Sequence, residues 1–190
     1  MRNDSPVKWD LFVRVFHWSL VLFFALAYLS GDFNVEDLHG WFGYVITVLI
    51  VGRFVWGFAG SANARFANFI YSPAETLAYF ASVIKNNPRH YVSHNPAGAL
   101  MVFALLASLV ALVASGLLLE DWGEYEGPLW AMHVSIGDAL GHLAKYVHKA
   151  LPEILLAMVG LHILGVVVAT LQHRENFVHA MWYGQEKPRD

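Results

Sequence analysis

The sequence predicts an all-α integral membrane protein, a bundle of four helices that each cross the bilayer. The first observation is composition, because 57% of the 190 residues are hydrophobic and only 14% are charged, whereas soluble domains carry about 25% charged residues. The second is that the apolar residues fall in long runs. A helix needs about 20 mostly apolar residues to cross a hydrocarbon core roughly 30 Å thick. Four runs satisfy this requirement, at about 11–30, 39–58, 97–119 and 149–171.

The four runs differ in how plainly they indicate a membrane helix. The first, 11–30, is long for a signal peptide and is not followed by a small-residue cleavage site, so we expect a retained helix. The third, 97–119, contains no charged residue, and a soluble core helix is seldom apolar on every face over such a length. The fourth, 149–171, contains Pro152, which we expect either to start this helix or to kink it.

The segment between the second and third runs predicts a shorter helix over about 73–85. Ser72 is a candidate N-cap, Pro73 takes the first helical position, and Glu75 can close a capping box. The apolar residues of this helix fall on one stripe. It is therefore either an amphipathic helix on the inner membrane surface or an ordinary loop helix packed on protein.

Three further features of the sequence concern the outer segment, the number of domains and the kinds of cofactor site that are excluded. The segment 120–146 is glycine-rich and acidic, and we expect it to be partly helical near 135–148. No repeat or low-complexity linker divides the chain, so residues 1–190 are predicted to form one domain. The absence of cysteine excludes disulfides, cysteine-ligated iron–sulfur clusters and covalent CxxCH haem attachment.

The basic residues are distributed unevenly between the two sides of the predicted bundle. With four spans, both termini and the middle segment share one side. That side carries Arg2, Lys8, Arg14, Arg53, Arg65, Lys85, Arg89, Arg174, Lys187 and Arg189. The other side carries only Lys145 and Lys149. Because lysine and arginine are enriched in cytoplasmic loops, we expect both the N and C termini to be cytoplasmic.

Four of the histidines, His17, His39, His148 and His162, lie within or at the ends of the predicted spans. An ionisable side chain in a membrane span is costly and usually marks function. His148 and His162 are fourteen residues apart, close to four helical turns, so they share one helix face and lie roughly 21 Å apart along the axis. With the N-terminus inside, His17 lies at the depth of His162, and His39 lies at the outer surface with His148.

Two histidine pairs at two depths favour a cofactor that takes one axial ligand from each of two helices. Haem bridges the helices of a bundle in this way. A zinc or iron site would more often show three or four ligands at one level, with carboxylates. The sequence therefore predicts two haems in the core of the bundle, with the four histidines as axial ligands of the iron.

Two glycines support a flat cofactor over a bare metal ion. Gly43 lies one turn after His39, and Gly165 lies one turn after His162. A residue without a side chain at these positions lets a macrocycle lie against the helix.

Two arginines are candidates to bind the cofactor's carboxylates. Arg14 lies one turn before His17, where it could pair with a haem propionate. Arg53 is fourteen residues from His39, so one face of that helix carries a ligand at its outer end and a cation at its inner end. The alternative for both is membrane anchoring, with the charged group extended to the lipid headgroups.

The other histidines have simpler expectations. His90, His94, His173 and His179 lie in the predicted cytoplasmic loop and tail, where we expect them to face solvent or lipid headgroups. His133 and His142 lie in the outer segment and stay ambiguous.

Motifs along almost the whole chain resemble those of the prokaryotic cytochrome b561 family, which is grouped with the b-type cytochrome subunits of nickel–iron hydrogenases. The motifs are "RVFHW", "LHGWFGY", "GRFVWG", "SHNPAGALMV", and "VH" and "GLH" running into "HRENFVHAM". The resemblance implies a bacterial inner-membrane, multi-pass cytochrome that binds two b haems. Its four histidine ligands would be His17, His39, His148 and His162. Pro152, one turn after His148, departs from the family pattern and makes His142 the alternative outer ligand.

The resemblance also implies a respiratory-chain function. Family members exchange electrons between a membrane quinone and a soluble or peripheral partner, such as a c-type cytochrome or the electron-transfer subunit of an enzyme. Two axial imidazoles leave haem iron no open position, which favours electron transfer over oxygen activation. No catalytic residue and no nucleic-acid partner is expected, and the protein is expected to contact membrane lipid.

Two other functions stay open at this point. One is a stand-alone quinone-linked oxidoreductase that acts on a small molecule, resembling a superoxide oxidase, for which Lys145 or Lys149 could line a substrate site. The other is a haem-bearing membrane anchor subunit. The outer carboxylates Glu120, Asp121, Glu124 and Glu126 either steer a basic partner or form an ordinary solvated loop.

Overall fold

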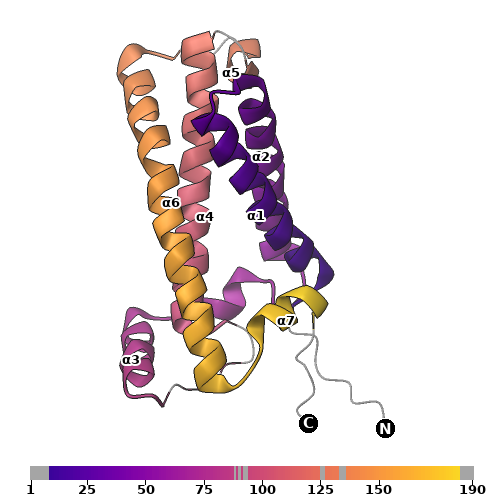
Figure 1. Ribbon diagram of the computed structural model, residues 1–190, viewed down its shortest axis with the longest axis vertical. Helices are drawn as coiled ribbons and strands as arrows, with labels where there is room; N and C mark the ends of the chain where they lie inside the picture. The colour runs from indigo at the N-terminus through magenta and orange to yellow at the C-terminus, as the bar shows by residue number, and fades with distance from the viewer. Residues whose placement is uncertain are drawn as a thin grey trace. The chain divides into compact units, whose positions relative to one another are not determined.

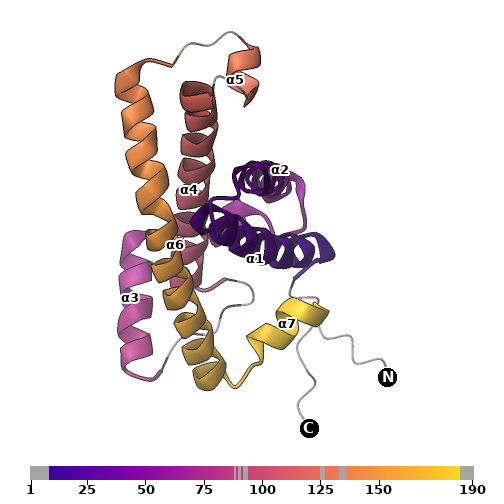
Figure 2. The same cartoon turned by 45° about the horizontal axis from the view of Figure 1, so that its top comes forward.

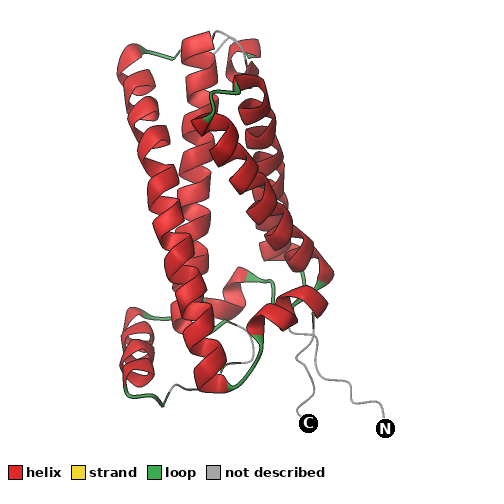
Figure 3. Ribbon diagram, in the orientation of Figure 1, coloured by secondary structure: helices red, strands yellow, loops and turns green. Residues whose placement is uncertain are grey.

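The regular structure of the chain is helical throughout the part that the computed structural model describes, residues 9–87, 89, 91, 94–124, 127–132 and 136–184 (Figure 1). Figure 3 shows helices and loops over these residues. The elements are α1 (Leu11–Asp32), α2 (Glu36–Ala59), η1 (Phe66–Phe69), α3 (Pro73–Ile84), α4 (Pro96–Leu119), η2 (Glu120–Glu124), α5 (Gly127–Ala131), α6 (Asp138–His173) and α7 (Phe177–Tyr183).

Four of these helices are long and apolar enough to cross a membrane, which confirms the all-α class and the four predicted spans. They are α1, α2, α4 continued through Trp122, and α6. Large apolar side chains are exposed on each, for example Leu11, Val48, Leu100 and Leu171. Exposed leucine and valine suit a lipid environment, because lipid tails are as apolar as these side chains.

Helix α6 is longer than the sequence predicts. It begins at Asp138 rather than near 149 and runs to His173, and Figures 1 and 2 both draw it as one continuous helix. Pro152 lies in its interior, so the alternative in which Pro152 starts the helix is wrong. The first turns carry Asp, His and Lys among Ala and Leu, which ends the apolar run although several of these residues are good helix formers. The expected helix near 135–148 is thus the start of α6.

The chain packs as two compact units, and each unit draws on all four long helices. Unit 1 comprises Met1–Leu20, Val51–Phe103 and Gly160–Asp190, and unit 2 comprises Val21–Ile50 and Ala104–Val159. The boundary falls inside helices and not in a linker. The organisation of residues 1–190 as one domain stays a prediction.

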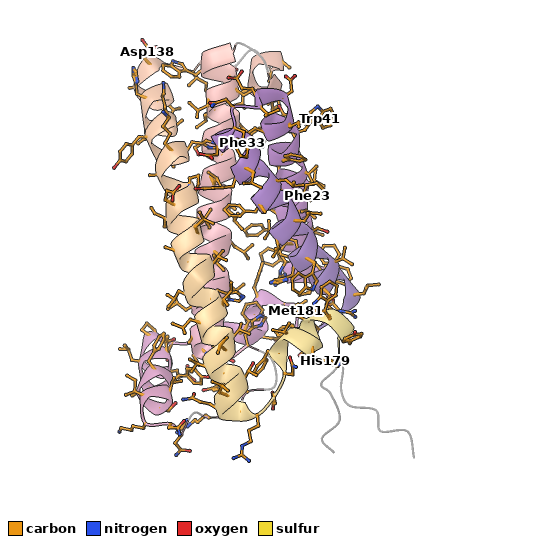
Figure 4. All side chains as sticks on the ribbon, viewed as in Figure 1. Phe23, Phe33, Trp41, Asp138, His179 and Met181 are labelled. Atoms are coloured by element: carbon orange, nitrogen blue, oxygen red, sulfur yellow. The ribbon has the colours of Figure 1, made fainter. Side chains whose placement is uncertain are left out.

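Unit 1 has an apolar core at the start of α1 and along α7. The core consists of Trp9, Val13, Ala64 and Ala180, with Trp56 and Met181 packed against it. Trp18 stacks on Trp182 with 4.5 Å between ring centroids, and Figure 4 labels Met181 on the same short helix. Gly184 ends α7 at φ 81°, in the left-handed region that glycine adopts without strain.

Unit 2 is held by aromatic contacts between its helices. The rings of Phe23 and Phe42 lie 6.0 Å apart, and Figure 4 labels Phe23 on α1. Trp122 packs so closely on Gly141 that a side chain at that glycine would clash with the indole. The Trp122 indole N–H also donates to Asp138 Oδ1 at 3.2 Å, at the first residue of α6.

Helix α3 begins with the predicted capping box. Ser72 Oγ accepts the Glu75 N–H at 3.2 Å, and Glu75 Oε2 accepts the Ser72 N–H at 3.0 Å. The apolar stripe of Leu77, Phe80 and Ile84 is exposed, with 69%, 43% and 85% of these side chains accessible. The stripe is therefore not covered by the described protein, which favours the membrane-surface alternative over a helix packed on protein through this face.

Candidate functional site

Helices α1 and α6 bring His17 and His162 together in unit 1, and we name these residues the α1/α6 pair. Their ring centroids lie 6.5 Å apart with an interplanar angle of 50°. The edge of the Trp18 ring lies against His17, with 5.0 Å between centroids. The Nδ1 atom of His17 is buried and has no hydrogen-bond partner.

Helices α2 and α6 bring His39 and His148 together in unit 2, and we name these residues the α2/α6 pair. Their ring centroids lie 5.9 Å apart at 87°. His39 Nδ1 lies 2.8 Å from the Ala27 carbonyl, and His148 Nδ1 lies 3.0 Å from the Leu112 carbonyl. A carbonyl oxygen only accepts, so both Nδ1 atoms carry the proton, and each Nε2 keeps a lone pair for a metal.

Two glycines that the sequence analysis did not single out leave room for the rings of the α2/α6 pair. A Cβ on Gly31 would lie 3.0 Å from His39 Nδ1, and a Cβ on Gly116 would lie 2.9 Å from His148 Cε1. Each glycine lies four residues after the residue whose carbonyl accepts from the same ring. This spacing on one helix face is the sequence signal that could have identified them.

The predicted glycines are placed differently. A Cβ on either Gly43 or Gly165 would meet no atom within 4 Å in the described structure. Their proposed contact with a macrocycle therefore stays a prediction.

Both pairs fit one metal ion bound between two imidazoles. A metal–imidazole bond is about 2.0 Å, and a ring nitrogen lies about 1.1 Å from its centroid, so imidazoles on opposite sides of one metal have centroids about 6 Å apart. The observed 6.5 and 5.9 Å lie on either side of this value. No cluster of three or more His, Cys, Asp or Glu that could hold a metal occurs among the described residues. Two nitrogen donors suit a macrocyclic cofactor that supplies the remaining ligands itself.

Comparison with known proteins agrees with this donor set. Residues 8–184 match the family model described as prokaryotic cytochrome b561. The chain belongs to this family. Membership confirms the resemblance seen in the sequence and makes the chain a multi-pass membrane protein of a b-type cytochrome family, which implies haem b and membrane electron transfer.

Three similar proteins share one description, "Probable Ni/Fe-hydrogenase B-type cytochrome subunit". The Azotobacter vinelandii protein is 28% identical over an alignment of 114 positions that covers 51% of this chain and 46% of that protein. The Bradyrhizobium diazoefficiens protein is 21% identical over an alignment of 211 positions, gaps included, that covers 94% of this chain and 84% of that protein. The Rhodobacter capsulatus protein is 22% identical over an alignment of 229 positions, gaps included, that covers 100% of this chain and 84% of that protein.

The two arginines of this cytochrome b561 homologue have different environments. Arg14 Nη2 donates to the Trp182 carbonyl in the last turn of α7, where a cation is favoured by the helix dipole. Its role at a propionate stays a prediction. Arg53 is buried in the described protein, with 3% exposure, which argues against the anchoring alternative for this residue. Its Nη2 donates to the Ala64 carbonyl at 3.1 Å, and its Cζ lies 4.6 Å from the Phe66 ring centroid.

His94 does not face solvent, contrary to the sequence-based expectation. Its ring is half-buried between Trp9 and Phe69, with centroid distances of 4.6 and 4.3 Å. Burial, together with the charges of Arg53 and His162, lowers the pKa of His94 to about 3, so the ring is neutral at pH 7. Its Nδ1 is buried without a hydrogen-bond partner.

Three of the remaining candidates, His142, Lys145 and Lys149, lie on α6 in unit 2. His142, the alternative outer ligand, is exposed and packs on Trp122 at 5.0 Å, whereas His148 faces His39. Lys145 and Lys149 are exposed on α6. His90 and His133 lie outside the described residues.

One of the four acidic residues of the predicted surface patch is not at the surface. Asp121 is buried, with 3% exposure, and its Oδ1 has no partner, so the expectation of a solvent-facing carboxylate is wrong here. Glu120 accepts a hydrogen bond from the Tyr44 hydroxyl. Glu126 and the side chain of Glu124 lie outside the described part of the chain.

Proposed function

We propose that this protein carries electrons across the bacterial inner membrane through two b haems, between the quinone pool and a redox partner. The observation that carries the proposal is the spacing of the two histidine pairs, 6.5 and 5.9 Å, which suits one metal between each pair of rings. His17 and His162 would hold one haem, and His39 and His148 the other.

The protein's own residues set how such a cofactor would work. When bound, haem supplies reversible one-electron oxidation and reduction. If both imidazoles of a pair held the iron, no coordination position would be left for another ligand, so these residues would favour electron transfer over ligand activation. The carbonyls of Ala27 and Leu112 orient the His39 and His148 rings and raise their basicity as ligands.

The charge distribution supports an orientation for this path. The excess of lysine and arginine in both termini and the middle segment puts these parts in the cytoplasm. The α1/α6 pair then lies toward the cytoplasm and the α2/α6 pair toward the outer face.

The partner follows from the names of the similar proteins. Because three of them are described as hydrogenase b-type cytochrome subunits, a hydrogenase-like enzyme at the outer face is the partner we favour, with a c-type cytochrome as the alternative. Membrane quinone, expected from the family resemblance, is the other redox partner.

A stand-alone quinone-linked oxidoreductase is a second candidate. The observation in its favour is that Lys145 and Lys149 are both exposed on α6 near His148, where they could attract a small anion. A haem-bearing membrane anchor subunit is the other alternative. In that case, loss of this chain would detach the partner enzyme from the membrane, but the chain would not carry electrons.

Haem stoichiometry and assignment test the proposal. Purified protein should contain two acid-acetone-extractable haems per chain in a pyridine haemochrome assay, because no cysteine can attach them covalently. H162A should deplete one spectral component and H39A the other. The control H142A, which alters an exposed ring packed on Trp122, should keep both. One haem or none in the wild type, or loss of the same component in H162A and H39A, would refute the proposal.

A further inference from the structure

Arg53 is a buried cation whose hydrogen-bonding capacity is only partly used. Its side chain is 3% exposed, one nitrogen donates to the Ala64 carbonyl, and the other terminal nitrogen, Nη1, is buried without a partner. The Phe66 ring face stabilises the guanidinium but accepts no strong hydrogen bond. A buried charge is costly unless it is paired and hydrogen-bonded, so an acceptor is missing from this site.

His94 shares the environment of Arg53. Arg53 and His94 contact one aromatic cluster, because Arg53 Cζ lies 4.6 Å from the Phe66 ring centroid, Phe66 lies 5.9 Å from Phe69, and Phe69 lies 4.3 Å from His94. The charges of Arg53 and His162 also act on His94. Trp9 and Phe69 fix the His94 ring, and the Tyr71 hydroxyl fixes its backbone by donating to the His94 carbonyl at 2.8 Å. The unpartnered Nδ1 of His94 is thus a second oriented nitrogen in the same unit.

The chain does not itself supply the missing acceptor among its described residues. Asp10 is the acid whose charge acts on Arg53, but its carboxylate is already used. It accepts hydrogen bonds from the Trp56 indole, the Ser61 hydroxyl and the Val13 N–H. An oxygen acceptor from outside the chain would satisfy both Arg53 and His94.

We propose that Arg53 and His94 form a carboxylate-binding pocket that holds a propionate of the haem bound by the α1/α6 pair. A carboxylate matches the planar fork of a guanidinium and carries the negative charge that a buried arginine needs. His94 is a positioning residue here, because His17 and His162 already supply two axial nitrogens. Arg14 also has a nitrogen without a partner, Nε, but its side chain is only half-buried, so its charge needs a carboxylate less than that of Arg53 does. The inference rests on the proposed function, since it needs a haem at this pair.

The pocket should affect the redox potential of that haem. A propionate compensated by a cation and an N–H donor stabilises the ferric state less than an uncompensated one does. R53Q and H94L should therefore lower the midpoint potential of the α1/α6 haem. We expect a shift of about tenfold in the ferrous-to-ferric ratio at fixed applied potential, which is about 59 mV for a one-electron couple. H94Q, which keeps an N–H donor, should shift it less than H94L.

Optical redox titration of the full-length protein in nanodiscs tests this, with the haem of the α2/α6 pair as the internal reference. H142Q is the matched control, because His142 packs on Trp122 in unit 2. The expected result is two haems in every variant, a lowered potential for the α1/α6 haem in R53Q and H94L, and partial rescue in H94Q and R53K.

Three results would overturn the pocket. One is an unchanged potential in both R53Q and H94L. A second is an equal shift in H94Q and H94L, which would indicate ring packing and not hydrogen bonding. A third is unchanged potentials with weakened binding of decylubiquinone, which would assign the pocket to a quinone. Absence of haem from the wild-type protein would refute the proposed function itself. The haem-to-protein ratio of the wild type measures this independently of the potentials of the variants.

Discussion

Replacing Gly116 with alanine should weaken the hold of the α2/α6 pair on its cofactor. The new Cβ would lie 2.9 Å from His148 Cε1, whereas carbon atoms pack at about 3.5 Å or more, so the ring must retreat by about 0.6 Å. The ring is not free to do so, because its Nδ1 is held 3.0 Å from the Leu112 carbonyl and 3.1 Å from Ser115 Oγ. A displacement of this size is enough to break such hydrogen bonds.

The magnitude follows from the usual cost of overpacking, about 1–3 kcal/mol. At about 1.4 kcal/mol per factor of ten, haem affinity at the α2/α6 pair should fall about 5- to 150-fold. The assay is transfer of haem from the detergent-solubilised protein to excess apomyoglobin, resolved into its two spectral components. G40A is the matched control, since a Cβ there meets no atom within 4 Å. Equal haem retention in G116A, G40A and wild type would refute the packing argument, as would selective loss of the α1/α6 haem.

Two further predictions concern Asp10, just before α1, and the exposed helix α3. Burial raises the pKa of Asp10, but hydrogen bonds from Ser61, Trp56 and the backbone outweigh burial and lower the pKa below its usual value of 3.8. The charged carboxylate therefore stabilises the fold above pH 3.8. The thermal unfolding temperature of D10N should approach that of wild type only as the pH falls below this value. A constant difference across pH 3–6 would contradict this. The chain has no cysteine, so a nitroxide attached to L77C is a unique probe. The label at L77C should be relaxed by lipid-soluble oxygen more strongly than the same label at A78C. If an aqueous relaxation agent reached the two labels equally, this would argue against membrane contact.

The sequence contains enough information to predict the spans and the histidine pairs, because both depend on local periodicity. An apolar run of about 20 residues needs a bilayer whatever its neighbours are, and residues fourteen apart share a helix face by geometry alone. The structure accordingly brings His17 to His162 and His39 to His148, as the depth argument predicts. The sequence places the start of the fourth span near 149, and not at Asp138, because the span is defined by its apolar run and the first turns of α6 are polar.

The environments of His94 and Asp121 could not be predicted in the same way. His94 is buried by Trp9 and Phe69, which come from separate segments of the chain, and no local pattern indicates that these rings meet. Asp121 follows an apolar helix in a glycine-rich acidic stretch, a context typical of solvated loops, yet it is buried where α4 passes into the π-helical turn η2. Polar residues buried by tertiary packing are therefore the part of the candidate site that only the structure reveals.

The two pairs differ in one feature that should set the order of their potentials. Both Nδ1 atoms of the α2/α6 pair donate to carbonyls, which makes the imidazoles more basic and stabilises ferric haem. In the α1/α6 pair, His17 Nδ1 has no acceptor, so this stabilisation is weaker. We therefore expect the haem of the α2/α6 pair to have the lower midpoint potential. Electrons would then move downhill from the outer face toward the cytoplasmic side, the direction needed if an outer hydrogenase-like donor reduces quinone. Redox titration of wild type, with H39A to identify the α2/α6 component, measures the order directly. A higher potential for the component that H39A removes would reverse the inferred direction.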